Sequence, residues 1–93
     1  MNETINKIKR ILMERYYVVL GKQCTKEYIV YRFYLDYKNS NIVKKYEKVH
    51  YQSKEGYRKK WKISETEMSI QEFLNNKVYD LLSRGYELEV LDE

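Results

Sequence analysis

Cations and tyrosine rings are interleaved along the middle of the chain, between residues 28 and 62. Lysine and arginine neutralise the phosphates of a nucleic acid, and tyrosine rings stack on its bases at roughly 1–3 kcal/mol each. This combination predicts a surface for single-stranded nucleic acid, DNA or RNA. The residues expected to line it are Tyr28, Arg32, Tyr34, Lys44, Tyr46, Lys48, His50, Arg58, Lys60 and Lys62.

This surface exists only if three strands direct those side chains to one side of a sheet. For the strand over 42–52, the condition is that the even-numbered positions point away from the core. The alternative is a sheet face that only contacts solvent and binds no ligand. An uncovered sheet face must be polar in any case, and lysines on strands prevent edge-to-edge aggregation.

The residues capable of catalysis do not form a recognisable set. A dyad of Cys24 and His50 would need an orienting group and an oxyanion site. One cysteine and one histidine cannot supply the usual structural zinc ligands. Gly21, Gly56 and Gly85 lie too far apart in the sequence for a phosphate-binding loop. We therefore expect a protein that is not an enzyme and that uses no cofactor and no metal.

A second functional class also fits the composition. The chain has eleven tyrosines, no proline and no alanine, and much of this bias follows from AT-rich codons. Tyrosine and arginine nevertheless dominate the energetic centres of protein interfaces. The alternative is a phage- or plasmid-type effector that inhibits or adapts a larger host protein or nucleoprotein, as in anti-defence systems. Its contact residues would include Tyr28, Arg32, Tyr34 and Tyr46.

Charge is distributed unevenly along the sequence. The formal net charge is +4, yet residues 42–63 hold eight basic and two acidic side chains, and residues 64–93 hold two basic and eight acidic ones. The basic middle indicates an anionic partner. The acidic C-terminal segment could instead pair with the basic segment, within one chain or across a homodimer.

Length and hydropathy predict a small domain in a reducing compartment. A chain of 93 residues corresponds to a single compact domain over 1–93. No apolar run approaches the length of a membrane span, and no signal-peptide core is visible at the N-terminus. The lone Cys24 excludes an internal disulfide, so we expect a cytoplasmic protein without membrane contact.

The first half of the chain predicts a helix followed by strands. Isoleucine and leucine recur at helical spacing over residues 3–14. A short strand over 16–20 and a loop over 21–26 are expected next. Residues 28–37 alternate strictly, with Ile29, Tyr31, Phe33, Leu35 and Tyr37 on the apolar face. The polar segment 38–41 is typical of a hairpin connection.

The second half predicts two more strands, a helix and a final strand. The run 42–52 alternates poorly, which indicates a β-bulge or an overhanging strand. A hairpin turn over 53–56 precedes a strand starting at residue 57. Ser69 and Glu72 form a capping box, Met68 and Phe73 form a hydrophobic staple, and Gly85 ends the helix. A short strand over 86–90 follows.

The predicted element order is therefore α-β-β-β-β-α-β, which places the chain in the α+β class. The expected architecture is an antiparallel sheet, made of a four-stranded meander plus a short C-terminal strand. Two helices are expected to pack on one face, because that arrangement buries both apolar stripes.

Overall fold

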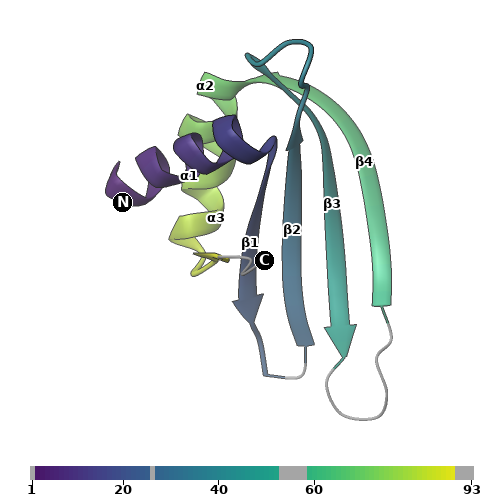
Figure 1. Ribbon diagram of the computed structural model, residues 1–93. Coiled ribbons are helices and arrows are strands. Elements are labelled where there is room, and N and C mark those ends of the chain that lie inside the picture. Colours follow the sequence, from purple (N-terminus) through teal and green to yellow (C-terminus); the bar gives the residue numbers. More distant parts are fainter. Residues whose placement is uncertain (1, 26, 53–58, 90–93) are drawn as a thin grey trace.

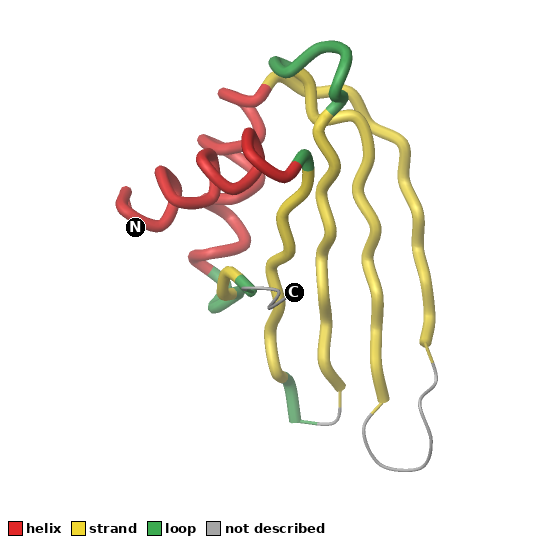
Figure 2. Tube along the Cα trace, viewed as in Figure 1, coloured by secondary structure: helices red, strands yellow, loops and turns green. Residues whose placement is uncertain are grey.

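The chain folds into one antiparallel sheet and two helical segments (Figure 1, Figure 2). The computed structural model describes residues 2–25, 27–52 and 59–89, and for residues 51, 52 and 59–65 it describes the backbone alone. The elements are α1 (Asn2–Arg15), β1 (Tyr17–Gln23), β2 (Glu27–Leu35), β3 (Ile42–Gln52), β4 (Lys59–Ser69), α2 (Ile70–Glu72), η1 (Phe73–Val78), α3 (Tyr79–Ser83) and β5 (Glu87–Leu88). The strand order is β4-β3-β2-β1-β5, which confirms the predicted class and element order.

Helix α1 follows the apolar spacing of its sequence. Ile8 and Leu12 are fully buried, one turn apart on the face that meets the sheet. The helix ends at Tyr16, whose backbone has a φ of 64° and whose amide donates to the Leu12 carbonyl at 2.9 Å. This left-handed residue turns the chain directly into β1, so no connecting loop is needed.

The second helical segment begins and ends where the sequence predicts. The Ser69 hydroxyl accepts a hydrogen bond from the Glu72 amide at 3.1 Å, which confirms the cap. Gly85 has a φ of 91°, a conformation that favours glycine after a helix. Between these ends, α2, η1 and α3 form one continuous segment, and its middle six residues are π-helical, a feature that the sequence did not reveal.

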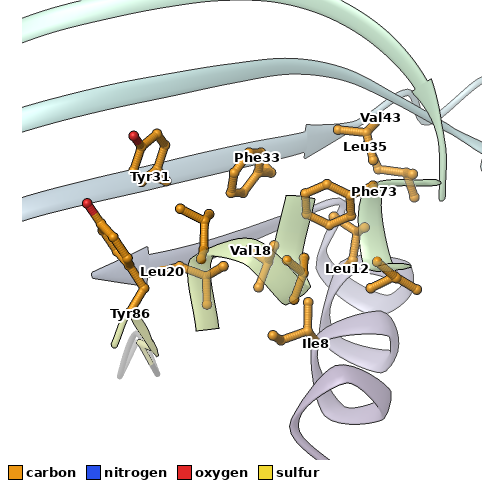
Figure 3. Packing of buried hydrophobic residues seen from close by; sticks show 13 residues of the cluster. Ile8, Leu12, Val18, Leu20, Tyr31, Phe33, Leu35, Val43, Phe73 and Tyr86 are labelled. Atoms are coloured by element: carbon orange, nitrogen blue, oxygen red, sulfur yellow. The ribbon is translucent and has the colours of Figure 1, made fainter. Parts of the chain in front are cut away.

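The core lies between the two helical segments and one face of the sheet (Figure 3). The Phe33 and Phe73 rings meet edge to face, with centroids 4.7 Å apart, and join the sheet to η1. The buried cluster consists of Ile8, Leu12, Val18, Leu20, Tyr31, Phe33, Leu35, Val43, Phe73, Leu74, Val78, Leu81 and Tyr86. Both helical segments therefore pack on the same face, as predicted. We call this side the helix face and the opposite side the open face.

A β-bulge at Lys44 divides β3 into two parts with opposite orientations. Leu35 pairs with Val43, whereas Tyr34 pairs with Lys45, so Lys44 is the extra residue. Because side chains alternate along a strand, one extra residue moves all later side chains to the other face. Val43 consequently lies in the core on the helix face, while Val49 packs with Val19 and Val30 on the open face. The predicted irregularity of this strand is confirmed.

Strand lengths differ from the sequence prediction in β1, β2, β4 and β5. Strand β2 ends at Leu35, so Tyr37, which was predicted on its apolar face, lies exposed in the turn. Residues 21–23 were expected in a loop, but they extend β1 because they pair with residues 28–30 of β2. Strand β4 continues to Ser69, the residue predicted to cap the helix, by pairing with Ile42. The last strand is only Glu87–Leu88 and pairs with β1. The predicted turn over 53–56 lies outside the described residues, and the turn over 38–41 is confirmed.

The two ends of the sheet are covered differently. In Figure 1, both helical segments lie beside the β1–β2 half of the sheet, and the lower parts of β3 and β4 extend beyond them.

Across the part of the chain that the structure describes, no helix is long and apolar enough to cross a membrane.

Candidate functional site

The open face carries only part of the predicted nucleic-acid surface. Val19, Val30 and Val49 form a buried ridge along its middle, flanked by Tyr17 and Tyr28. Three of the predicted residues, Tyr28, Arg32 and Tyr34, lie on this face because they alternate with the core residues of β2. Lys45 and Glu47 join them from β3, opposite Tyr34 and Arg32 in the strand register.

Glu47 compensates the cations of this face. Its carboxylate lies 3.1 Å from the Lys45 ammonium and 3.9 Å from the Arg32 guanidinium, and it accepts a hydrogen bond from the Tyr34 hydroxyl at 3.1 Å. The Glu47 side chain is only 11% exposed, so these contacts hold a mostly buried charge. Burial, followed by the contact with Glu47, raises the pKa of the Tyr34 phenol. The described part of the open face is therefore aromatic, its two β2 and β3 cations share one carboxylate, and no cationic stripe crosses it.

The prediction that Tyr46, Lys48 and His50 point to the open face is wrong. These residues pair with Phe33, Tyr31 and Ile29, respectively, and share their side of the sheet, the helix face. The physical reason is the bulge at Lys44, which reverses the expected alternation. Lys44 itself is exposed at the bulge.

The side chains of three further residues of the predicted surface lie outside the described part of the structure. Arg58 lies outside the described residues. Lys60 and Lys62 are described by their backbone alone, and there they pair with His50 and Lys48 of β3. The ten predicted residues thus form no single group in the described part of the molecule.

A different group of cations and rings assembles on the helix face. The Lys48 ammonium lies 5.4 Å from the centroid of the Tyr31 ring, and the Lys77 ammonium lies 5.6 Å from the same centroid. Lys77 is also 5.2 Å from the centroid of Tyr46. We call this group the lysine–tyrosine cluster; it consists of Lys22, Lys48, Lys77, Tyr31, Tyr46 and Tyr86.

Five segments build the cluster, the fifth being the connection between α3 and β5 that carries Tyr86. Lys22 comes from β1, where its ammonium lies 5.8 Å from the centroid of the Tyr86 ring and donates to the Arg84 carbonyl at 2.6 Å. Lys48 and Tyr46 come from β3, and Lys77 comes from the π-helical turn η1. The Tyr31 ring of β2 meets the Tyr86 ring edge to face, with centroids 5.3 Å apart, beneath these cations.

Sequence reasoning missed Lys22 and Lys77. Lys22 was assigned to a loop, and its position became visible only with the longer β1. The sequence does contain a signal for the position of Lys77. This residue stands three residues after Leu74 and four before Leu81, both of which are buried. A lysine at that spacing lies beside the buried stripe of its helix, so its ammonium extends toward the sheet.

The helix face also contains one histidine–carboxylate pair. The Nδ1 atom of His50 lies 3.0 Å from Oε2 of Glu27, near the end of the sheet where β2 begins. Within the described ranges, no group of three or more histidine, cysteine, aspartate or glutamate residues is arranged to hold a metal ion.

Glycine at position 21 permits a close contact at the edge of the open face. A Cβ atom on Gly21 would overlap Oε1 of Glu89 and the hydroxyl oxygen of Tyr28. The Glu89 amide donates to the Val19 carbonyl at 2.9 Å, which brings this carboxylate over β1. Burial raises the pKa of the Glu89 carboxyl. The edge of the open face beside β5 is thus occupied by an acidic residue.

Comparisons with protein-family models, with curated proteins and with solved structures found no match to this chain. The function proposed below therefore rests on the sequence and on the geometry of the two faces.

Proposed function

We propose that this chain is a non-catalytic protein that binds single-stranded nucleic acid, and that the lysine–tyrosine cluster contacts the phosphates. The observation that carries the proposal is that the ammonium groups of Lys48 and Lys77 lie 5.4 Å and 5.6 Å, respectively, from the centroid of the same ring, Tyr31. Among the described side chains, no carboxylate lies within salt-bridge distance of either ammonium. Two like charges that lie near one ring and have no carboxylate at salt-bridge distance repel each other, so an anion bound close to both is stabilised.

The overall charge supports the same class of partner. The chain is basic, with a net charge of +4 and an isoelectric point near 9.1. Lys22, which belongs to the same cluster, and the exposed Lys44 on β3 add two further cations. A nucleic acid presents phosphates at regular spacing, and basic patches of this kind raise the rate at which it associates.

The salt dependence of binding tests this function. Three phosphate contacts to a single strand correspond to a slope of about −2 in log affinity against log salt, or an affinity loss of about twentyfold between 50 and 200 mM salt. The measurement is fluorescence anisotropy of a labelled single-stranded oligonucleotide. The variant Lys48→Gln/Lys77→Gln should bind weakly with a slope of about −0.7. Lys9→Gln/Lys38→Gln removes two exposed charges elsewhere and serves as the matched control. Equal binding by both double variants would contradict the proposal.

A second candidate, docking on a host protein, is favoured by the open face. The Tyr17 and Tyr34 rings stack there with centroids 6.3 Å apart, and Glu47 compensates the neighbouring cations. The centres of protein interfaces are depleted of net charge and enriched in tyrosine and arginine. In this candidate the protein inhibits or adapts a larger host protein or nucleoprotein.

A pull-down separates the second candidate from the first. A protein partner should remain bound after nuclease treatment and in high salt, and Tyr17→Ala/Tyr34→Ala should release it. The control is Tyr37→Ala, because Tyr37 is 71% exposed and lies in the turn after β2. Retention of nucleic acid alone counts against docking on a protein. In either case, the single cysteine fits our proposal of a cytoplasmic location.

A further inference from the structure

We propose that Lys48 and Lys77 together form a phosphate site, which contacts the backbone of the nucleic acid and makes no contact with its bases. This inference rests on the proposed function and deepens it, since it names the part of the ligand that the cluster recognises. It replaces base stacking, which the sequence suggested, with backbone contact.

The rings of the cluster are not available for stacking on bases. Tyr31 is 7% exposed and Tyr86 is 8% exposed, so neither ring offers a face to a ligand. Tyr46 is half-buried, with Lys77 over its ring and Phe33 beside it at a centroid distance of 6.0 Å. The rings therefore support the lysines, and the ammonium groups are the parts of the cluster left to meet a ligand.

The two lysines reach the same ring from different elements. Lys48 lies on β3 after the bulge, and Lys77 lies in the π-helical turn η1. A π-helical turn holds more residues than an α-helical one, and such turns are frequent at functional sites. Here the part of β3 after the bulge contributes Lys48 and the π-helical turn contributes Lys77, and both ammonium groups lie near the Tyr31 ring. Two irregular elements thus converge on one pair of like charges, which a phosphate would compensate.

The acidic side chains near Lys77 determine the side from which a phosphate approaches this lysine. A surface hollow of about 460 Å³ lies between the end of β4 and the second helical segment, and Glu67, Glu72 and Asp80 line it together with Lys77. A polyanion is repelled from these carboxylates. The phosphates therefore approach from the Tyr31 side of Lys77, along Lys48.

Titration with inorganic tripolyphosphate, followed by the backbone NMR signals of residues 31, 48 and 77, tests the site without any base. We expect saturable shifts at those residues and competition with a bound oligonucleotide. The variant Lys48→Gln/Lys77→Gln should weaken tripolyphosphate binding about tenfold or more, whereas Lys48→Arg/Lys77→Arg should retain it. An abasic oligonucleotide should bind within about threefold of the matched normal one, because bases contribute little at this site.

The outcomes separate this inference from the proposed function. Oligonucleotide binding that tripolyphosphate does not disturb, or that the abasic strand loses, overturns the phosphate site and leaves nucleic-acid binding in place. Tripolyphosphate binding without oligonucleotide binding keeps the site and rejects the proposed function. If neither tripolyphosphate nor the oligonucleotide binds, the phosphate site and the proposed function are both rejected. Binding of a polyglutamate peptide in place of tripolyphosphate also overturns the inference, because it assigns the lysines to an acidic protein.

Discussion

Single side chains determine which cations of this protein can meet an anion. Arg32 and Lys45 share the mostly buried carboxylate of Glu47, whereas Lys48 and Lys77 share a ring, Tyr31. A carboxylate neutralises a cation, but an aromatic ring only orients it and provides a modest attraction. The described cations of the two faces therefore have different partners, although both faces contain lysine and tyrosine.

Removal of the Glu47 carboxylate should destabilise the fold. Glu47→Ala leaves Tyr34 and Lys45 without their common partner, and we expect the free energy of unfolding to fall by roughly 1–3 kcal/mol. Urea unfolding followed by circular dichroism measures this. Tyr34→Phe removes one of the hydrogen bonds and should cost less, about 0.5–1.5 kcal/mol. Equal stability of Glu47→Ala and the parent protein would show that the group carries no net stabilisation.

Glu89 should make stability depend on pH. Burial raises its pKa above the ordinary value of 4.5, so the folded chain holds this proton more tightly than the unfolded chain does. Its contribution to stability is present below pH 4.5 and is lost as the pH rises through the higher folded pKa.

The variant Glu89→Gln removes this dependence. Relative to the parent protein, it should become progressively more stable between about pH 4 and pH 7, as measured by urea unfolding across that range. The trend should persist at high salt, because its cause is burial and not attraction between exposed charges. A stability difference that stays constant with pH would contradict the assignment.

At the scale of elements, regular patterns could be predicted from the sequence and irregular ones could not. Strict alternation over 28–37 identified Tyr31 and Phe33 as core residues, and both are buried. The cap at Ser69 was visible because its hydrogen bond is local. The bulge was expected within 42–52, but its position was not fixed, since lysines and valines there satisfy either face. Because the bulge lies at Lys44, the residues after it lie on the face opposite to the predicted one, and this applies to Tyr46, Lys48 and His50.

Deletion of Lys44 tests the role of the bulge. Without the extra residue, either Val43 or the fully buried Val49 must leave its present face. We expect a loss of several kcal/mol or failure to fold cooperatively, because a one-residue slip exchanges the faces of the strand. Thermal unfolding measures it. Lys44→Thr keeps the residue count and should change stability by less than about 1 kcal/mol. A deletion variant as stable as the parent would show that β3 accommodates the slip.

At the scale of the whole molecule, the described side chains of the basic middle and of the acidic third form no ion pairs with each other. The ion pairs of the acidic third include Asp80 with Arg84, at 3.3 Å within the second helical segment. Among the described side chains, no ion pair joins residues 42–52 to residues 66–89. Within that part of the chain, the acidic third therefore does not neutralise the basic middle through ion pairs, which is consistent with our proposal of an anionic partner.

The most direct test compares charge removal on the two faces. Affinity for one labelled single-stranded oligonucleotide at low salt is measured for Lys48→Gln/Lys77→Gln on the helix face and Arg32→Gln/Lys45→Gln on the open face, after circular dichroism shows that both are folded. We predict a loss of about tenfold or more for the helix-face variant and less than about threefold for the open-face variant. The opposite order, or equal losses, would contradict the assignment of the anion-binding surface to the lysine–tyrosine cluster.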